Sequence, residues 1–129
     1  MDYFYDLKNT VKQALAEDVG TCDLTAELVE ETTQATAKVI VKEPAVLCGK
    51  IWAEETIFQV DPEIRTEWQF EDGEEVASGE ILVTLDGKAR SILTAERTML
   101  NFMQFLSAVA TKTRNFVEKI KHTNSQLLD

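Results

Sequence analysis

The feature of this chain that most constrains its fold is a long apolar helix predicted between residues 89 and 113. Apolar side chains recur around most of the circumference of this helix, which is typical of a helix buried on several sides. These side chains are Met99, Leu100, Phe102, Met103, Phe105, Leu106 and Val109. A chain of 129 residues is long enough for one domain with a real core, so we expect other elements to pack around this helix.

A polar stripe crosses the same helix on one face. Steps of three and four residues place Arg90, Thr94, Arg97, Asn101, Gln104, Ala108 and Thr111 in line. A small domain does not need a polar line along its most apolar helix. We therefore treat the stripe as the place to look for functional residues.

Arg97 is the strongest candidate within the stripe. A guanidinium offers a rigid fork of donors that matches carboxylate or phosphate, and it stays charged at all physiological pH values. Glu96 is a poor partner, because adjacent helical residues point about 100° apart. Asn101 shares the face of Arg97 and could orient it or donate to a ligand. An equally weighted alternative is a buried Arg97 paired with an acidic residue of a sheet.

The rest of the chain predicts short helices and antiparallel strands, hence an α+β fold. The expected elements are helices at 3–18 and 25–29, a strand at 34–43, a helix at 51–60, and strands at 63–70 and 80–85. Turn chemistry is supplied by Asp72-Gly73 and Asp86-Gly87. The first helix should bury Leu7, Val11 and Leu15, next to Tyr3 and Phe4. The short helix at 51–60 offers Ile51, Trp52, Ile57, Phe58 and Val60 to the core.

The charge distribution argues against nucleic acid and anionic membranes as partners. Residues 1–85 carry six basic and nineteen acidic side chains, whereas residues 86–129 carry seven and four, giving the net charge of −10. No apolar run is long enough to span a membrane, and the acidic N-terminus does not resemble a secretory signal. We therefore expect a cytoplasmic protein in which Cys22 and Cys48 are reduced and partly buried.

Other chemistry has weak support in the sequence. The carboxylates of Glu17, Asp18 and Asp23 could bind a metal ion, but helix capping explains them more simply, so no metal ligand is predicted. His122 fits a helix C-terminus. No nucleophile motif or phosphate loop is present, so no catalytic residue is predicted. The glycine rhythm of residues 73–82 is similar to hairpins of biotinyl and lipoyl carrier domains, although the carrier lysine is absent.

Three segments together resemble the N-terminal part of the quinolinate phosphoribosyltransferases, also called nicotinate-nucleotide pyrophosphorylases (carboxylating). The segments are residues 14–26, 72–87 and 89–113. The specific motif is Glu96-Arg97-Thr98, followed by Leu100-Asn101, Ser107 and Ala110-Thr111. Two departures are Cys22, where the family usually has glycine, and Ala108-Val109 in place of Gly-Ile. If those glycines allow positive φ or close packing, the local turn and helix packing must differ here.

The resemblance implies an N-terminal α/β sandwich over residues 1–113, with a mainly antiparallel sheet packed on helices. Residues 114–129 would then be the end of the long helix and the start of an α/β barrel that is missing. The implied parent enzyme makes nicotinate mononucleotide, CO2 and pyrophosphate from quinolinate and phosphoribosyl pyrophosphate. Mg²⁺ would assist, with its ligands outside this chain.

The resemblance also implies a homodimer or higher oligomer, in which Arg97 reaches the quinolinate carboxylates in the partner's barrel. Asn101 would support Arg97, and Glu96 would be structural. The chain is then expected to be a fragment that is inactive by itself. Two alternatives are a related phosphoribosyltransferase with another ring-acid substrate, and a non-enzymatic carrier-like binding domain.

Overall fold

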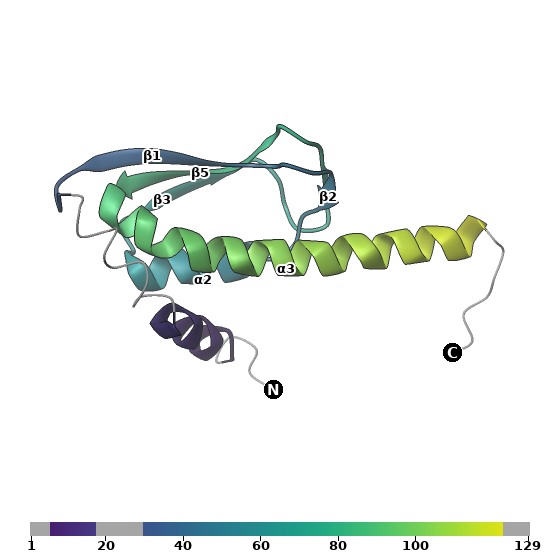
Figure 1. The fold of residues 1–129 in the computed structure, drawn as a ribbon, viewed down its shortest axis with the longest axis horizontal. Coiled ribbons are helices and arrows are strands. Elements are labelled where there is room, and N and C mark those ends of the chain that lie inside the picture. Colours follow the sequence, from purple (N-terminus) through teal and green to yellow (C-terminus); the bar gives the residue numbers. More distant parts are fainter. Residues whose placement is uncertain (1–5, 18–29, 123–129) are drawn as a thin grey trace.

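The computed structural model describes residues 6–17 and 30–122, which form an antiparallel sheet lying over helices (Figure 1). A helix at residues 6–17 comes first. The elements that follow are β1 (Gln34–Ile40), β2 (Ala45–Val46), α2 (Lys50–Val60), β3 (Arg65–Trp68), β4 (Glu75–Val76), β5 (Ile81–Lys88) and α3 (Ala89–His122). The α+β fold predicted from the sequence is confirmed. The helical turn expected at 25–29 lies outside the described residues.

Two antiparallel sheets are present in the described part of the chain. The larger has the order β1-β5-β3, and β2 pairs with β4 in a two-stranded ribbon. Exposed and half-buried residues alternate along β1, as the pattern of the sequence predicts for a strand with one face on the core. The turn at Asp72-Gly73 is confirmed, with Gly73 at φ +93° and the amide of Glu74 donating to Glu71 O at 3.2 Å.

The second predicted turn, at Asp86-Gly87, is wrong. Both residues lie within β5, where Asp86 is opposite Thr36 on one side and Arg65 on the other. Gly87 is needed for packing, because a Cβ atom there would lie 3.1 Å from Cγ1 of Ile64. The strand therefore runs directly into α3, and the amide of Ala89 donates to Thr33 O at 2.8 Å.

The core forms where the sheet and α2 meet the first half of α3. Buried residues from these elements include Leu47, Ala53, Ile57, Val83, Leu85, Ile92, Ala95, Met99 and Met103. A second cluster is formed by the helix at residues 6–17, which buries Leu7, Val11 and Leu15 as predicted. This cluster packs on Trp52 and Phe102, whose ring centroids are 5.3 Å apart.

The helix α2 buries a narrower face than its sequence suggests. Ala53, Thr56 and Ile57 are buried, whereas Ile51 and Phe58 are 48% and 62% exposed. The prediction that Ile51 and Phe58 join the core is therefore wrong, because α2 packs on α3 through one face only. Buried Thr56 donates its hydroxyl to Trp52 O at 2.8 Å, which satisfies its polar group.

The helix α3 is more exposed than predicted. It ends at His122, as the sequence predicts, and its second half extends beyond the sheet (Figure 1). Phe105, Val109 and Phe116 are 69%, 49% and 60% exposed. The expected burial on several sides is thus wrong for these residues within the described structure, because the sheet and α2 cover only one side of α3.

Candidate functional site

The polar stripe of α3 lies on its solvent face. Arg97, Asn101 and Gln104 are exposed, whereas Ala95, Thr98 and Met99 between and beside them are buried. Helical geometry places positions 97, 101 and 104 within about 60° of one another. The structure therefore brings these predicted residues together on one face. It also excludes the alternative in which Arg97 is buried against the sheet.

The N-terminal end of the polar stripe is partly covered by other residues. Arg90 is half-buried and forms an ion pair of 3.4 Å with exposed Glu31. Thr94 donates its hydroxyl to Arg90 O at 3.0 Å. Glu96 is exposed as well, but it borders a groove beside β1, on another side of the helix from Arg97.

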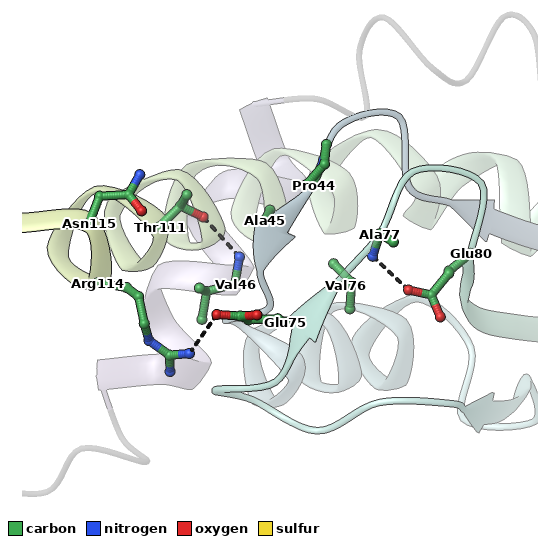
Figure 2. Close-up of a pocket in the computed structure, with 10 residues that line it drawn as sticks. All are labelled: Pro44, Ala45, Val46, Glu75, Val76, Ala77, Glu80, Thr111, Arg114 and Asn115. Atoms are coloured by element: carbon green, nitrogen blue, oxygen red, sulfur yellow. Dashed lines mark hydrogen bonds and ion pairs between the residues drawn. The ribbon is translucent and has the colours of Figure 1, made fainter. Parts of the chain in front are cut away.

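Ser107 and Thr111 attach α3 to the segment that contains β2. The Ser107 hydroxyl accepts from the Cys48 amide at 3.0 Å and donates to Cys48 O at 3.1 Å. Thr111 Oγ1 accepts from the Val46 amide at 2.9 Å (Figure 2). Sequence reasoning did not find this role, although two hydroxyl residues four positions apart on a helix were the available signal. The contacts set how α3 is rotated relative to the ribbon.

A pocket of about 520 Å³ lies between β2, β4 and the second half of α3 (Figure 2). Arg114 reaches Glu75 at 3.4 Å and Gly73 O at 3.0 Å, so this cation already has protein partners. Arg114 is one helical step beyond Thr111, and sequence reasoning did not single it out as a site residue. The pocket thus holds an engaged arginine and does not have the arrangement of a catalytic site.

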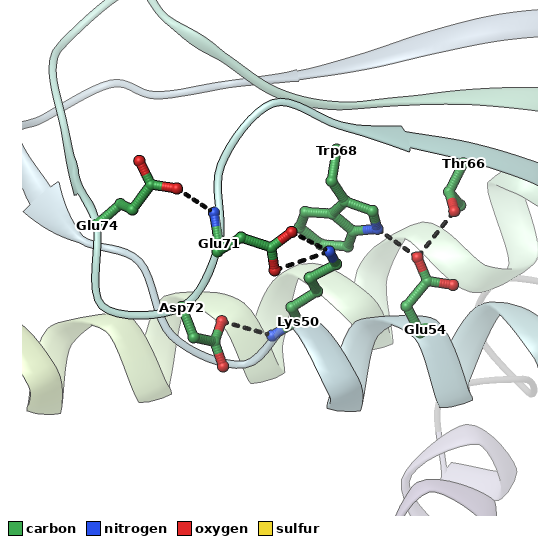
Figure 3. A network of polar contacts seen from close by, with 7 residues as sticks. All are labelled: Lys50, Glu54, Thr66, Trp68, Glu71, Asp72 and Glu74. Carbon is green, nitrogen blue, oxygen red and sulfur yellow. Dashed lines mark hydrogen bonds and ion pairs between the residues drawn. The ribbon is translucent and has the colours of Figure 1, made fainter.

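A polar network joins α2 to β3 and the following turn (Figure 3). Lys50 Nζ contacts both carboxylate oxygens of Glu71 at 2.9 and 3.0 Å, and it lies 5.5 Å from the ring centroid of Trp68. Glu54 accepts from Thr66 at 2.8 Å and from the indole N–H of Trp68.

The start of α2 is capped from the same turn. Asp72 accepts from the amides of Lys50 at 3.1 Å and Gly49 at 3.3 Å. Gly49 has φ +106°, and a Cβ atom there would meet Leu106 at 3.0 Å. The network and this cap are structural, because every charge in them has a protein partner.

Two titratable groups are shifted by their surroundings. Burial, together with the Asp72 carboxylate, raises the pKa of the Cys48 thiol, which makes it a poor nucleophile. The Glu63 amide at 3.0 Å, followed by the Ser91 hydroxyl at 2.7 Å, lowers the pKa of Asp61. Cys22 lies outside the described residues.

No three potential metal ligands come together among residues 6–17 and 30–122. Within the same ranges, no helix has the length and apolar character that a membrane span requires.

Residues 23–107 match the family described as quinolinate phosphoribosyl transferase, N-terminal domain. The chain therefore belongs to the quinolinate phosphoribosyltransferase family, through its N-terminal domain.

Individual relatives agree with this assignment. The chain is 40% identical over 115 residues to quinolinate phosphoribosyltransferase [decarboxylating] 1 of Nicotiana glauca, covering 85% of this chain and 32% of that protein. A nicotinate-nucleotide pyrophosphorylase [carboxylating] of Mycobacterium leprae is 34% identical over 127 residues, which cover 95% of this chain and 44% of that protein.

A solved structure of the nicotinate-nucleotide pyrophosphorylase from Francisella tularensis has the same fold. It is 43% identical, with a TM-score of 0.84 over 89% of this chain and 41% of that chain. The chain spans about a third of the length of the first curated relatives that it matches. These matches confirm the resemblance inferred from the motifs.

Proposed function

We propose that this chain is the N-terminal domain of a decarboxylating quinolinate phosphoribosyltransferase. The reaction joins quinolinate to phosphoribosyl pyrophosphate and yields nicotinate mononucleotide, CO2 and pyrophosphate. The family assignment supports this proposal, as do the names of the relatives from Nicotiana glauca and Mycobacterium leprae. The cytoplasmic location inferred from the N-terminal composition stays a prediction.

The observation that carries the proposal is the exposed position of Arg97 on a rigid helix of 34 residues. Quinolinate has two ring carboxylates, and a guanidinium binds a carboxylate through two parallel hydrogen bonds. The buried neighbours Thr98 and Met99 fix the helix and hence the direction in which Arg97 leaves it. In this proposal Arg97 binds and orients one carboxylate of the substrate.

Asn101 supports Arg97 from one helical turn further along the stripe. Its side chain is exposed on the same face, and its amide can donate to a carboxylate or accept from the guanidinium. The side-chain amide of Asn101 forms directional hydrogen bonds and carries no charge. We therefore assign it a positioning role beside Arg97.

The substrate has to come to Arg97 from outside this domain. Arg97 and Asn101 face away from the core that α3 builds with the sheet, so residues of another domain or subunit must complete the site. The exposed apolar side chains of Phe105, Val109 and Phe116 favour contact with another protein surface. These two features support a homodimer or higher oligomer in which each Arg97 completes the partner's site.

The proposal places the rest of the chemistry outside the described residues. Groups that bind the phosphates and any Mg²⁺ are expected there, since residues 6–17 and 30–122 bring no three potential metal ligands together. By itself the chain is therefore expected to bind substrate weakly and to have no measurable activity.

A chimaera tests the proposal. Residues 6–122 replace the matching region of the Francisella tularensis protein, and nicotinate mononucleotide formation from quinolinate is measured with and without Arg97→Ala. We expect an active chimaera, in which the substitution lowers kcat/KM by about 2 kcal/mol of transition-state binding or more, roughly thirtyfold.

Two further variants sharpen this test. Arg97→Lys keeps the charge but loses the planar fork, so it should recover only part of the activity. Arg65→Ala removes another exposed arginine, on β3, and should leave the kinetics unchanged. Equal kinetics for Arg97→Ala and the unsubstituted chimaera would show that Arg97 has no role in binding quinolinate.

The alternatives are distinguished by substrate. Nicotinate offered in place of quinolinate lacks one carboxylate, and a preference for it or for another ring acid would favour a related phosphoribosyltransferase. The family match covers residues 73–82 within residues 23–107, so this segment belongs to this domain. The hairpin expected there is not formed, since β4 pairs with β2 and β5 pairs with β1 and β3. That match removes the reason for considering a carrier-like domain.

A further inference from the structure

Three polar side chains of α3 form a row that faces the β2–β4 ribbon. Ser107, Thr111 and Arg114 are four and three residues apart, so they lie on one side of the helix. Thr111 Oγ1 accepts from the Val46 amide at 2.9 Å, and Arg114 donates to Gly73 O at 3.0 Å (Figure 2). All three contact the ribbon or the segments next to it, and we call them the polar clamp.

Ser107 is the most constrained member of the polar clamp. Its hydroxyl accepts from the Cys48 amide at 3.0 Å and donates to Cys48 O at 3.1 Å, so a single residue uses both its donor and an acceptor site. The next residue, Gly49, lies so close to α3 that a Cβ atom there would be 3.0 Å from Leu106. Because hydrogen bonds are directional, these contacts fix the rotation of α3 about its own axis.

A second anchor lies in the first turn of α3, where Ser91 donates its hydroxyl to Asp61 at 2.7 Å. At about 1.5 Å per residue, Ser91 is about 24 Å from Ser107 along the helix axis, and Arg97 lies between them. Apolar side chains face the core between the two anchors, and the hydrophobic effect gives them no preferred direction. These side chains are Ile92, Ala95, Met99 and Met103.

The position of the Arg97 guanidinium depends on the rotation of α3. A rotation of about 10° moves an atom at the outer radius of a helix, about 6 Å from the axis, by about 1 Å. A displacement of about 1 Å is large for a group that binds a carboxylate through two parallel hydrogen bonds, and it can lower a rate about a hundredfold. A quinolinate site that uses Arg97 therefore needs contacts that keep α3 in one rotation.

We propose that the polar clamp is a positioning element for the quinolinate site, in which Ser107 and Thr111 keep α3 in the rotation that directs Arg97 at a substrate carboxylate. This inference rests on the proposed function, because it requires Arg97 to bind quinolinate. Ser107 and Thr111 act through Arg97 and do not contact the substrate. Their loss should therefore weaken the binding of quinolinate and leave the binding of phosphoribosyl pyrophosphate unchanged.

Kinetics of the chimaera test the clamp with two variants at one position. Thr111→Val leaves the Val46 amide without its acceptor, whereas Thr111→Ser keeps a hydroxyl there. We expect Thr111→Val combined with Ser107→Ala to raise KM for quinolinate about tenfold, with KM for phosphoribosyl pyrophosphate unchanged within about twofold. Thr111→Ser should keep both KM values of the unsubstituted chimaera.

Two controls separate positioning from a loss of folded protein. Thr113→Val makes the same chemical change two residues along α3, where the exposed hydroxyl bonds only to Val109 O, and it should leave both KM values unchanged. In the Arg97→Ala background, the clamp substitutions should have no further effect on KM for quinolinate. A loss of folded protein would instead lower kcat in both backgrounds and leave KM as it is.

The rotation of α3 is also measured without catalysis. Spin labels are attached to the 129-residue chain at Arg97→Cys and at Glu67→Cys on exposed β3, with both native cysteines replaced by serine. The labelled chain is diluted into unlabelled chain, so that pulsed electron paramagnetic resonance reads the distance within one chain. We expect the clamp substitutions to shift or broaden this distance, and Thr113→Val to leave it unchanged.

Three outcomes would overturn the proposal. They are a label distance that the clamp substitutions do not change, an unchanged KM for quinolinate in the chimaera, and an equal rise in this KM with and without Arg97. Unchanged kinetics for Arg97→Ala alone would overturn the proposed function, whereas the label distance would still report whether the clamp fixes α3. The two failures are therefore separable.

Discussion

Ser107 and Thr111 show how single hydroxyl groups can hold a helix in place. Each satisfies backbone groups of the segment around β2, and Thr111 also donates to Ser107 O at 2.7 Å. The β2–β4 ribbon has only two residues in each strand, so its own ladder is short. The hydroxyl groups of Ser107 and Thr111 therefore attach this ribbon to α3.

Ser107→Ala should destabilise the chain by about 1–3 kcal/mol, because the part-buried Cys48 amide loses its acceptor. Urea unfolding followed by circular dichroism measures the change. Thr113→Ala is the control, since the exposed Thr113 hydroxyl bonds only to Val109 O of its own helix, and it should cost less than about 0.5 kcal/mol. Equal costs for the two variants would contradict the role of Ser107.

Asp61 should make the chain less stable in acid. The Glu63 amide, and after it the Ser91 hydroxyl, lowers the pKa of Asp61 in the folded state. Asp61 therefore contributes to the free energy of unfolding at pH values above the ordinary carboxyl pKa. This contribution is lost as the pH falls through the lowered pKa. Asp61→Asn should therefore flatten the fall in Tm below about pH 4. Tm is measured from pH 7 to pH 3, with Glu67→Gln on exposed β3 as control. Parallel curves for Asp61→Asn and the unsubstituted chain would show that Asp61 contributes nothing.

Residue patterns predicted local geometry well where one residue type implies one conformation. Gly73 in a turn and the burial of Leu7, Val11 and Leu15 follow directly from φ freedom and helical spacing. Gly87 shows the limit of such reasoning. A glycine after an aspartate has turn chemistry, yet here it leaves room for Ile64, which is a contact between segments far apart in sequence.

At the scale of elements, α3 combines three different surfaces. One side packs on the sheet and α2, one carries the polar stripe with Arg97, and one exposes Phe105, Val109 and Phe116. Residues 105, 109 and 116 share a face, since eleven residues return the helix to within about 20°. Amphipathic periodicity alone could not say which apolar face the sheet would cover.

The exposed apolar face of α3 should make the chain self-associate. We expect sedimentation velocity to show a species larger than the 14.5 kDa monomer, and expect Phe105→Ser with Phe116→Ser to weaken the association more than tenfold. Phe58→Ser, an equally exposed phenylalanine on α2, is the matched control. A monomer at every concentration of the unsubstituted chain would contradict the interface.

For the whole molecule, the sequence led to the family and to the α+β class, because the Glu96-Arg97-Thr98 motif and the segment at 72–87 retain their order and spacing along the chain. It also placed Arg97 and Asn101 on one helical face. The division into residues 1–113 and 114–129 stays a prediction, although α3 runs through residue 113 without a break. The departure at Ala108 is accommodated by an exposed position on α3.

The sequence by itself determined the helices, the strands and the polar stripe, because the spacing of apolar residues and the turn residues act over only a few positions. The tertiary structure alone decided that Arg97 faces solvent, that Ile51 and Phe58 stay outside the core, and that the edge of β1 is left beside a groove. Each of these depends on which surfaces meet when distant segments pack, and such packing minimises exposed apolar area over the whole chain and not residue by residue.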